Sequence, residues 1–437
     1  MNQKTDIIIV GSGAAGLFHA LHLPHDKSIT IITKDEVTKS DSFLAQGGIC
    51  VLKSEEDYDS YYEDTMRAGH YENRKESVDI MIRSSREIIR ELITFGVDFE
   101  SDGENLLYTK EGGHSDSRIL FHADVTGREI TSKLLERVKK RDNIRILEYH
   151  TMIDLLTKNN TCYGVLIETP EGERIPLYAD YTVLACGGLG GLYKHSTNFR
   201  HITGDALAVA LEHNIQLEHI DYIQIHPTTL YSTEPGRRFL ISESVRGEGA
   251  ILLNKNKERF VNELLPRDLL TAKVREQMEK DDMPYVWLSM EPIPTDTIIN
   301  HFPNIYKRCL EEGYDCTKEP IPVVPAQHYF MGGIWVDSDS HTSMGHLYAI
   351  GETSCNGVHG RNRLASNSLL ESLVFAKRAA LHMSDSYDSL NNTSVPSDSA
   401  AETFTLEKVL SESEEERKRR YRQRVLEEIE EERKKHL

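Results

Sequence analysis

The chain has 437 residues, which is long enough for two or three domains with sizeable cores. Its composition, 39% hydrophobic and 28% charged, is near the average of globular proteins and excludes collagen-like and wholly disordered chains. The 70 acidic residues outnumber the 51 basic ones and give a formal charge of −19, so neither nucleic acid nor an anionic membrane is an expected partner. An anionic small substrate would need a local cluster of Arg and His side chains to bind.

The first elements predict a nucleotide-binding βαβ unit. Residues 6–10 form an apolar run typical of a buried strand, the segment GSGAAG predicts a tight turn into a helix, and residues 29–33 predict a second strand. Gly11, Gly13 and Gly16 fit the spacing G-x-G-x-x-G, which lets a pyrophosphate approach the helix N-terminus.

The residues after the second strand leave the ribose contact open. An acidic residue there would bind a ribose hydroxyl, but this sequence has Thr33 and Lys34, with Asp35 one position later. The motif alone therefore leaves a 2′-phosphate as an alternative.

Further along the chain, helical spacing of apolar residues at 75–95 predicts a helix, and residues 143–184 predict short strands. Mixed short strands and proline-containing helical segments then predict an inserted α+β domain. Segments typical of nucleotide binding return near residue 350, so the first domain is expected to be discontinuous. The predicted division is a Rossmann-like, doubly wound α/β domain at 1–221 and 331–385, a second domain at 222–330, a polar linker at 386–405 and a charged, solvated helix at 406–437.

The beginning of the sequence has no basic segment followed by a cleavage site, and no run approaches the roughly 18 to 20 apolar residues of a membrane span. We therefore expect a cytoplasmic protein. The six cysteines are scattered without a C-x-x-C pair, so we expect small buried side chains and neither disulfides nor a metal site.

Additional glycine-rich segments favour a long cofactor with two ends. Residues 40–48 and 184–191 supply small side chains and backbone donors, and residues 204–205 open a helix. Late in the chain, residues 351–352 follow a strand, and residues 367–368 lead into a helix whose amides would face an electron-rich ring. Together these segments favour FAD over NAD.

Over residues 5–380 the sequence resembles the flavoprotein family of succinate dehydrogenases, fumarate reductases and L-aspartate oxidases. The resemblance is carried by the segments GSGAAGL, AQGG, TGDA, QIHPTTL, SESVRGEGA, PRD, HYFMGG and GETSCNGVHGRNRLASNSLLE. It implies an FAD-binding domain, a mobile capping domain and a dicarboxylate pocket between them. The residues that it assigns to FAD are Gly11, Ser12, Gly13, Ala14, Ala15, Gly16, Lys34, Ser40, Ser42, Gln46, Gly47, Gly48, Asp205, Glu352, Ser368 and Leu369.

Two positions distinguish branches of this family. The membrane-linked members carry a histidine before AQGG that bonds covalently to the flavin, whereas this sequence has Asp41, so the resemblance implies non-covalent FAD. The loop KEGGHS at residues 110–115 is similar to that of L-aspartate oxidases, in which the Glu faces the α-ammonium of the substrate. Because a carboxylate next to an ammonium is a charge pair, Glu111 is the expected specificity residue.

The resemblance also assigns the substrate and proton-transfer groups. His226, His328 and Arg363 would bind the carboxylates, and Ser242 stands where the family usually has Thr. Arg267 matches the proton donor and acceptor. An isolated guanidinium is a poor base. Glu243 and Arg246, however, match a proton relay that would keep Arg267 from remaining in its neutral form.

The resemblance therefore implies FAD-dependent oxidation of L-aspartate to iminoaspartate, with reoxidation by fumarate or O2, as the first step of quinolinate and NAD biosynthesis. Quinolinate synthase would be the pathway partner. The alternatives are a soluble fumarate reductase and, in another class, a nucleotide-binding sensor without catalysis; the complete set of Arg267, Glu243 and Arg246 argues against the sensor.

Overall fold

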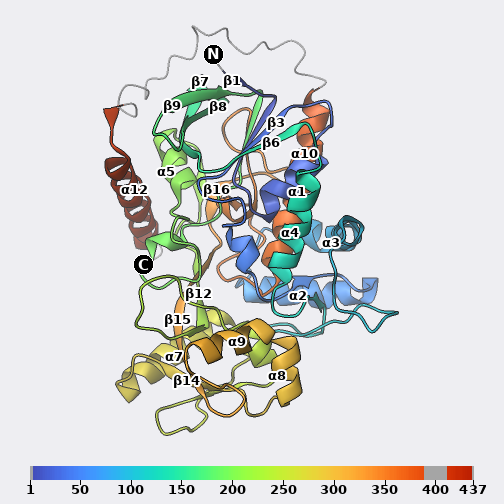
Figure 1. Ribbon diagram of the computed structural model, residues 1–437, viewed down its shortest axis with the longest axis vertical. Coiled ribbons are helices and arrows are strands. Elements are labelled where there is room, and N and C mark those ends of the chain that lie inside the picture. Colours follow the sequence, from blue (N-terminus) through green and yellow to red (C-terminus); the bar gives the residue numbers. More distant parts are fainter. Residues whose placement is uncertain (1–2, 388–410, 436–437) are drawn as a thin grey trace.

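The computed structural model describes residues 3–387 and 411–435. Figure 1 shows a large upper unit, which contains both ends of the described chain, and a smaller lower unit built from the middle of the sequence. Strands β12 and β15 run between the two units.

The upper unit is built on a five-stranded parallel sheet. Its order is β17 (Leu347–Ala349), β10 (Tyr181–Leu184), β2 (Ile7–Val10), β3 (Ile29–Ile32) and β6 (Ile144–Leu147). Strand β2, the first strand of this sheet along the chain, thus lies in the middle, which confirms the predicted doubly wound α/β architecture.

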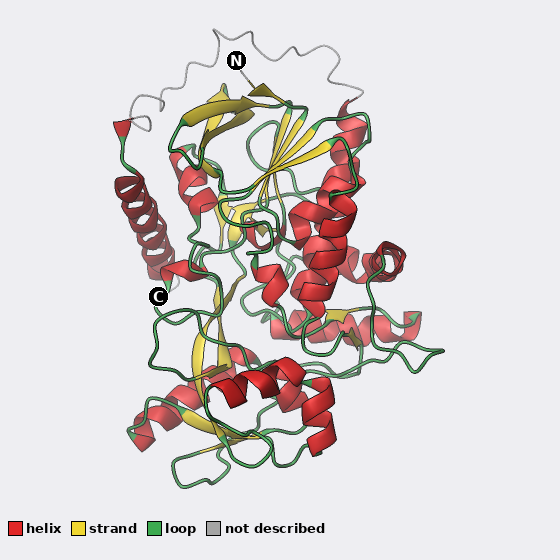
Figure 2. Cartoon of the chain, in the orientation of Figure 1, coloured by secondary structure: helices red, strands yellow, loops and turns green. Residues whose placement is uncertain are grey.

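Both faces of this sheet are covered, which explains why residues 7–10 are uniformly apolar. Ile7 and Ile9 belong to one hydrophobic cluster and Ile8 and Val10 to another. The helices of the first cluster, seen beside the sheet in Figure 2, include α1 (Ala14–His22), α3 (Lys75–Phe95), α4 (Thr126–Val138) and α10 (Asn367–Tyr387). The second cluster includes α5 (Asp205–Glu212) and a sheet of β1 (Gln3–Lys4), β9 (Arg174–Tyr178), β8 (Thr161–Glu168) and β7 (Thr151–Lys158).

Smaller elements complete the upper unit. They are η1 (Asp41–Leu44), β4 (Ile49–Cys50), η2 (Glu55–Asp57), α2 (Tyr58–Ala68), β5 (Ile119–Leu120), η3 (Gly190–Leu192), β11 (Leu217–Glu218), β16 (Gly333–Trp335), η4 (Gly351–Thr353) and β18 (Ser354–Cys355).

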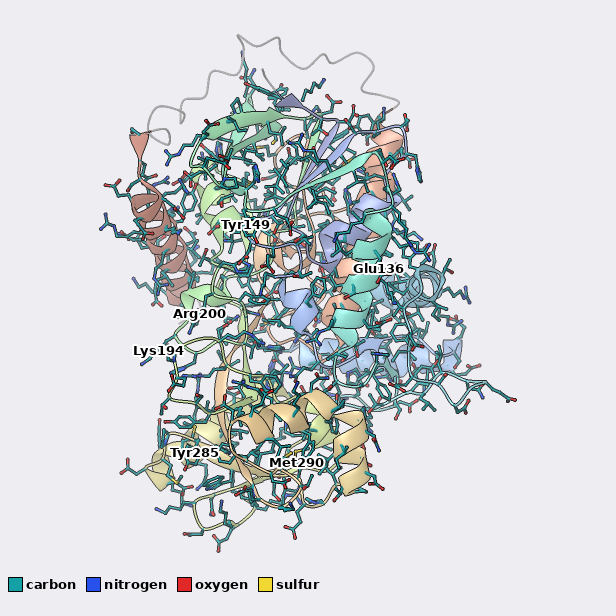
Figure 3. The ribbon with its side chains drawn as sticks, in the orientation of Figure 1. Glu136, Tyr149, Lys194, Arg200, Tyr285 and Met290 are labelled. Atoms are coloured by element: carbon teal, nitrogen blue, oxygen red, sulfur yellow. The ribbon has the colours of Figure 1, made fainter. Side chains whose placement is uncertain are left out.

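The lower unit has its own sheet and its own core. The sheet is antiparallel, in the order β12 (Ile223–Leu230), β15 (Ile321–Phe330), β14 (Val286–Ser289) and β13 (Ile251–Leu253). Its helices are α6 (Glu243–Gly247), α7 (Arg267–Asp281), α8 (Thr295–His301) and α9 (Pro303–Glu311). A separate hydrophobic cluster spans Leu230 to Val323, and Tyr285 and Met290 lie within this unit in Figure 3. We keep residues 222 and 330 as the proposed limits of a capping domain.

The C-terminal helix α12 (Glu414–Lys435) is not the fully solvated helix that its charge predicted. Tyr421, Val425 and Ile429 recur every four residues, are almost fully buried and join the cluster that contains α5, beside which α12 lies in Figure 1. Arg417 adds a buried ion pair with Glu168, with N and O 2.9 Å apart. The helix is therefore part of the core packing of the upper unit.

Other expectations have mixed outcomes. Residues 386–387 of the expected linker belong to α10, whereas 388–405, like residues 406–410 of the expected helix, lie outside the described residues. All six cysteines are free thiols; five are buried and Cys186 is half-buried. Within residues 3–387 and 411–435, every helix is too short or too polar to cross a membrane.

The packing of α12 yields a stability prediction. Val425→Ala removes two methyl groups from a fully buried site, so we expect the free energy of unfolding to fall by about 1–3 kcal/mol, measured by urea denaturation. Arg419→Ala, at an exposed position of the same helix, is the control and should change it by less than about 0.5 kcal/mol. Equal effects of the two substitutions would contradict the assigned packing.

Candidate active site

One large cavity runs from the carboxyl edge of the parallel sheet to the capping unit. Its empty volume is about 1710 Å³, including the part open to solvent. Because its wall takes in residues of both units, an elongated ligand fits it better than a compact one. Segments from both units line it, including the β2–α1 turn, η1, η4, β12 and the start of α7.

The glycine turn at one end is built for close backbone approach. Gly11 has a φ of 120°, and a Cβ there would lie 2.0 Å from the carbonyl oxygen of Ala185. A Cβ on Gly16 would lie 2.2 Å from the carbonyl oxygen of Gly11. The first turn of α1 has no acidic residue, so its N-terminus presents a positive dipole end to the cavity.

Lys34 replaces the acidic residue that would follow the second strand. Its Nζ lies 2.6 Å from Asp205 Oδ2, at the N-terminus of α5, and Thr203 Oγ1 donates to Asp205 Oδ1 at 2.6 Å. Asp205, which comes from a distant part of the chain, thus lies beside Lys34 on the cavity wall. Burial alone would raise the pKa of Asp205, but Lys34 keeps it below its usual range.

The structure brings most of the expected FAD residues to the cavity wall. Those on the wall are Gly11, Ser12, Gly13, Ala15, Lys34, Ser40, Ser42, Gln46, Gly47, Gly48, Asp205, Glu352, Ser368 and Leu369. Ala14 and Gly16 lie behind it, although the Ala14 amide donates to Ser42 Oγ at 3.0 Å. Within residues 3–387 and 411–435, Ser40 Oγ and Gln46 Oε1 are buried without a protein partner, as expected of groups that bind a polar ligand such as FAD.

The other end of the cavity is rich in positive charge. Arg267, the first residue of α7, and Arg363 are both almost fully buried, and both donate to the same amide oxygen, Gln224 Oε1, at 2.7 and 3.2 Å. Arg363 also donates to Ser368 Oγ. Burial, with Arg267 nearby, lowers the pKa of Arg363 to about 10, so this cation gains from the approach of an anion.

Glu243 joins two of the buried guanidinium groups. Its Oε2 accepts from Arg267 Nε at 2.6 Å and lies 3.6 Å from an Nη atom of Arg246. Burial alone would raise the pKa of Glu243, but Arg267 and Arg246 hold it below its usual range. Arg246 is not on the cavity wall; it contacts Glu243, which is.

Two histidines face each other across the same end, with ring centroids 5.1 Å apart. His226 Nδ1 contacts the Thr228 backbone, and within the described part of the chain its buried Nε2 has no partner. His328 Nδ1 contacts Thr197 Oγ1 at 2.7 Å. Burial and then the neighbouring Arg267 lower the pKa of both rings well below its ordinary value, so both are neutral hydrogen-bonding groups at pH 7.

Glu111 lies on the cavity wall with both carboxylate oxygens held. Oε1 accepts from Ser244 Oγ and Oε2 from Ser366 Oγ, both at 2.6 Å, and a Cβ on Gly47 would lie 2.8 Å from Oε1. Glu111 is 3% exposed, which excludes a solvated loop acid. Burial and the nearby Glu243 raise its pKa, so a cationic group brought beside it would stabilise its ionised form.

Two more carboxyl groups line the middle of the cavity. Asp41 accepts from the Phe199 amide at 2.9 Å, and burial raises its pKa to about 7. Glu352 accepts from the Phe330 amide at 2.9 Å, and burial and then Asp41 raise its pKa to about 8. Both side chains are half-buried on the cavity wall, and their raised pKa values favour the neutral carboxyl forms below pH 7.

Sequence reasoning missed three residues of this site. Gln224, Ser244 and Ser366 link the expected residues to one another, and Gln224 and Ser244 stand inside the segments QIHPTTL and SESVRGEGA. Ser242, which was expected at the site, lines the cavity and also caps α6 by accepting from the Ser244 amide. Among the described residues, no group of three or more His, Cys, Asp or Glu could hold a metal ion.

Comparisons with known proteins identify the family. Residues 6–369 match the family model described as an FAD binding domain. The chain is 51% identical to the L-aspartate oxidase of Clostridium perfringens over 391 residues, 89% of each chain, and 48% identical to that of Clostridium acetobutylicum over 388 residues, covering 88% of this chain and 89% of the relative. A solved E. coli quinol fumarate reductase chain superposes with a TM-score of 0.86 at 28% identity, covering 94% of this chain and 74% of that one. The chain therefore belongs to the L-aspartate oxidase family of FAD-binding flavoproteins.

Proposed function

We propose that this chain uses FAD to oxidise L-aspartate to iminoaspartate. The observation that carries the proposal is the position of Glu111, a buried carboxylate on the wall of the cavity end that also carries buried arginines and neutral imidazoles. A dicarboxylate alone would be repelled by Glu111, whereas the ammonium of an amino dicarboxylate would pair with it.

The two carboxylates of the substrate are assigned to the cationic groups. Arg363 offers a guanidinium suited to a two-point grip, and His226 and His328 offer directional donors from their Nε2 atoms. The unpartnered Nε2 of His226, within the described residues, supports this role. Ser242 lines the same wall and would donate its hydroxyl.

Proton transfer is assigned to Arg267. Its Nε–H points at Glu243, so a proton removed from the substrate by Arg267 has a route toward Glu243 and Arg246. In the reverse direction, Arg267 would give a proton to fumarate and recover one through Glu243. The relay answers the difficulty that an isolated guanidine is a poor base.

The residues around the glycine turn would hold the ADP portion of FAD. The N-terminus of α10 and Glu352 would hold the flavin portion. When bound, FAD supplies a ring that accepts a hydride from the substrate carbon and passes the electrons to fumarate or O2. Asp41 occupies the place of the histidine that would form a covalent bond, so we propose that the cofactor is bound non-covalently.

We also propose a place for the reaction. The product would serve quinolinate synthase in the route to NAD, and the enzyme would act in the cytoplasm, where six free thiols are stable. The alternative function, fumarate reduction or succinate oxidation, is supported by the fold shared with the fumarate reductase.

The first prediction concerns Glu111. Anaerobic L-aspartate should bleach the flavin of the purified protein rapidly, whereas succinate should do so slowly. Glu111→Gln keeps the shape and removes the charge, so the L-aspartate concentration for half-maximal bleaching should rise at least about tenfold, equivalent to about 1.4 kcal/mol. Rapid bleaching by succinate, or an unchanged requirement for L-aspartate in the variant, would favour the alternative function.

The second prediction concerns Arg267. Arg267→Lys keeps the positive charge but loses the two-point contact with Glu243 and Gln224, so kcat should fall by about 10²–10⁴ while the flavin stays bound. Steady-state kinetics and flavin absorbance check this. Arg275→Lys, at an exposed position of α7, is the control and should retain full activity. Full activity of Arg267→Lys would remove Arg267 from the proton path.

The third prediction concerns pH. Because burial raises the pKa of Asp41 from its ordinary value of 3.8 to about 7, the folded state holds an extra proton between these pH values, and this carboxyl costs stability as the pH rises. Asp41→Asn should therefore raise the melting temperature more at pH 8 than at pH 5, measured by thermal unfolding of flavin-loaded protein. Asp26→Asn, an exposed carboxyl, serves as the control. The same shift at both pH values would show that Asp41 is ionised throughout.

A further inference from the structure

The loop at residues 111–115, which carries Glu111, is fastened to α2 by a buried carboxylate. The backbone amide and the Oγ of Ser115 both donate to Asp64 Oδ2 at 2.7 Å. Arg67 bonds Asp64 Oδ1 at 2.5 Å and also donates to the Gly113 carbonyl at 3.4 Å. The Asp64 side chain is 1% exposed, so the bonds that Ser115 donates to it are largely shielded from solvent, whereas the Arg67 side chain is 52% exposed.

Arg118 connects Asp64 to a second carboxylate of the same region. One Nη of Arg118 donates to Asp64 Oδ2 at 2.7 Å, and the other donates to Asp57 Oδ1 at 2.9 Å and to Ser60 Oγ at 2.7 Å. The guanidinium is fully buried. Burial alone would raise the pKa of Asp64, but Ser115 and Arg118 hold it below its usual range, so Asp64 is charged at pH 7.

The far side of the loop is fixed by His114. Its Nε2 contacts the Ala365 carbonyl at 3.0 Å, and its Nδ1 faces an Nη of Arg118 at 3.2 Å. Burial lowers the pKa of His114 to about 4, so the ring is neutral and its Nε2 donates to that carbonyl while its Nδ1 accepts from Arg118. The loop is therefore attached both to α2 and to the segment that precedes α10.

The same network reaches the serine that holds Glu111. The guanidinium of Arg118 lies 5.0 Å from the ring centroid of Tyr61, whose OH donates to Asn367 Oδ1 at 2.8 Å. Asn367 is the neighbour of Ser366, which donates to Glu111 Oε2. Ser366 itself has a φ of 60°, an unfavourable value for a residue with a side chain, so its position depends on these surrounding contacts.

We propose that Asp64 and Arg118 are positioning residues for substrate selection. They hold the backbone of loop 111–115 and the serine partner of Glu111 in one rigid arrangement, and so keep the carboxylate where an α-ammonium would lie. A displacement of about 1 Å would weaken that charge pair while leaving the carboxylate-binding groups in place. The proposal rests on the proposed function of Glu111, and it concerns the preference for a C4 dicarboxylate with an amino group over one without.

The test compares two reactions of the flavin-loaded protein, oxidation of L-aspartate and reduction of fumarate by a reduced viologen dye. Asp64→Asn keeps the shape but removes the charge, and Arg118→Lys keeps the charge but cannot bridge both carboxylates. Each should raise the KM for L-aspartate at least about fivefold and change the KM for fumarate by less than about twofold. In a Glu111→Gln background, Asp64→Asn should add no further increase. Flavin content and melting temperature are measured on every variant.

Two further variants complete the design. Asp116→Asn breaks an exposed ion pair with Lys53 on the residue after this loop, and it should change neither KM. Ser115→Ala removes only the hydroxyl bond to Asp64, and it replaces Asp64→Asn in the test if that variant does not fold. It should raise the KM for L-aspartate and leave the KM for fumarate unchanged.

An equal rise in both KM values, or no rise in the folded variants, would overturn the proposal. If Glu111→Gln itself leaves the KM for L-aspartate unchanged, the proposed function of Glu111 fails first, and the role of Asp64 and Arg118 in selection fails with it.

Discussion

The site depends on an excess of buried positive charge. Arg267 and Arg246 share one carboxylate, Glu243, while Arg363 donates to the neutral groups of Gln224 and Ser368. Cations removed from water in this way are destabilised unless an anion joins them, as the lowered pKa of Arg363 indicates. A dicarboxylate ligand supplies the missing negative charge, so a protein with a net charge of −19 still has a place for an anion.

Neither unit holds this charge alone. Arg267, Glu243 and His226 come from the smaller unit, whereas Arg363 and Glu111 come from the larger one, and Gln224 on β12 contacts arginines of both. Strands β12 and β15, which run between the units in Figure 1, therefore carry the geometry of the site. Any motion between the units would change the distance between the two arginines, and with it the affinity for the anion.

The sequence predicted the parts of the structure that depend on local patterns. Four consecutive apolar residues followed by spaced glycines are enough to predict a central parallel strand and its turn. The apolar run and the glycine spacing each lie within a few consecutive residues, so both can be recognised locally. The Glu111 partners were not predictable in this way, since Ser244 and Ser366 are 133 and 255 residues away along the chain. The buried stripe of α12 was missed because Tyr421, Val425 and Ile429 are few among many charged residues, and only the facing α5 cluster gives them a partner.

The proposed selection of L-aspartate requires the carboxylate of Glu111 to bind the nitrogen of the substrate. A crystal structure of the flavin-loaded protein, reduced beforehand with dithionite so that it cannot oxidise its ligand and then soaked anaerobically with L-aspartate, measures this contact directly. The amino nitrogen should lie within hydrogen-bond distance of a Glu111 oxygen, and the two carboxylates should contact Arg363 and the histidines. An amino group directed away from Glu111, or a loop 111–115 turned toward solvent, would contradict it.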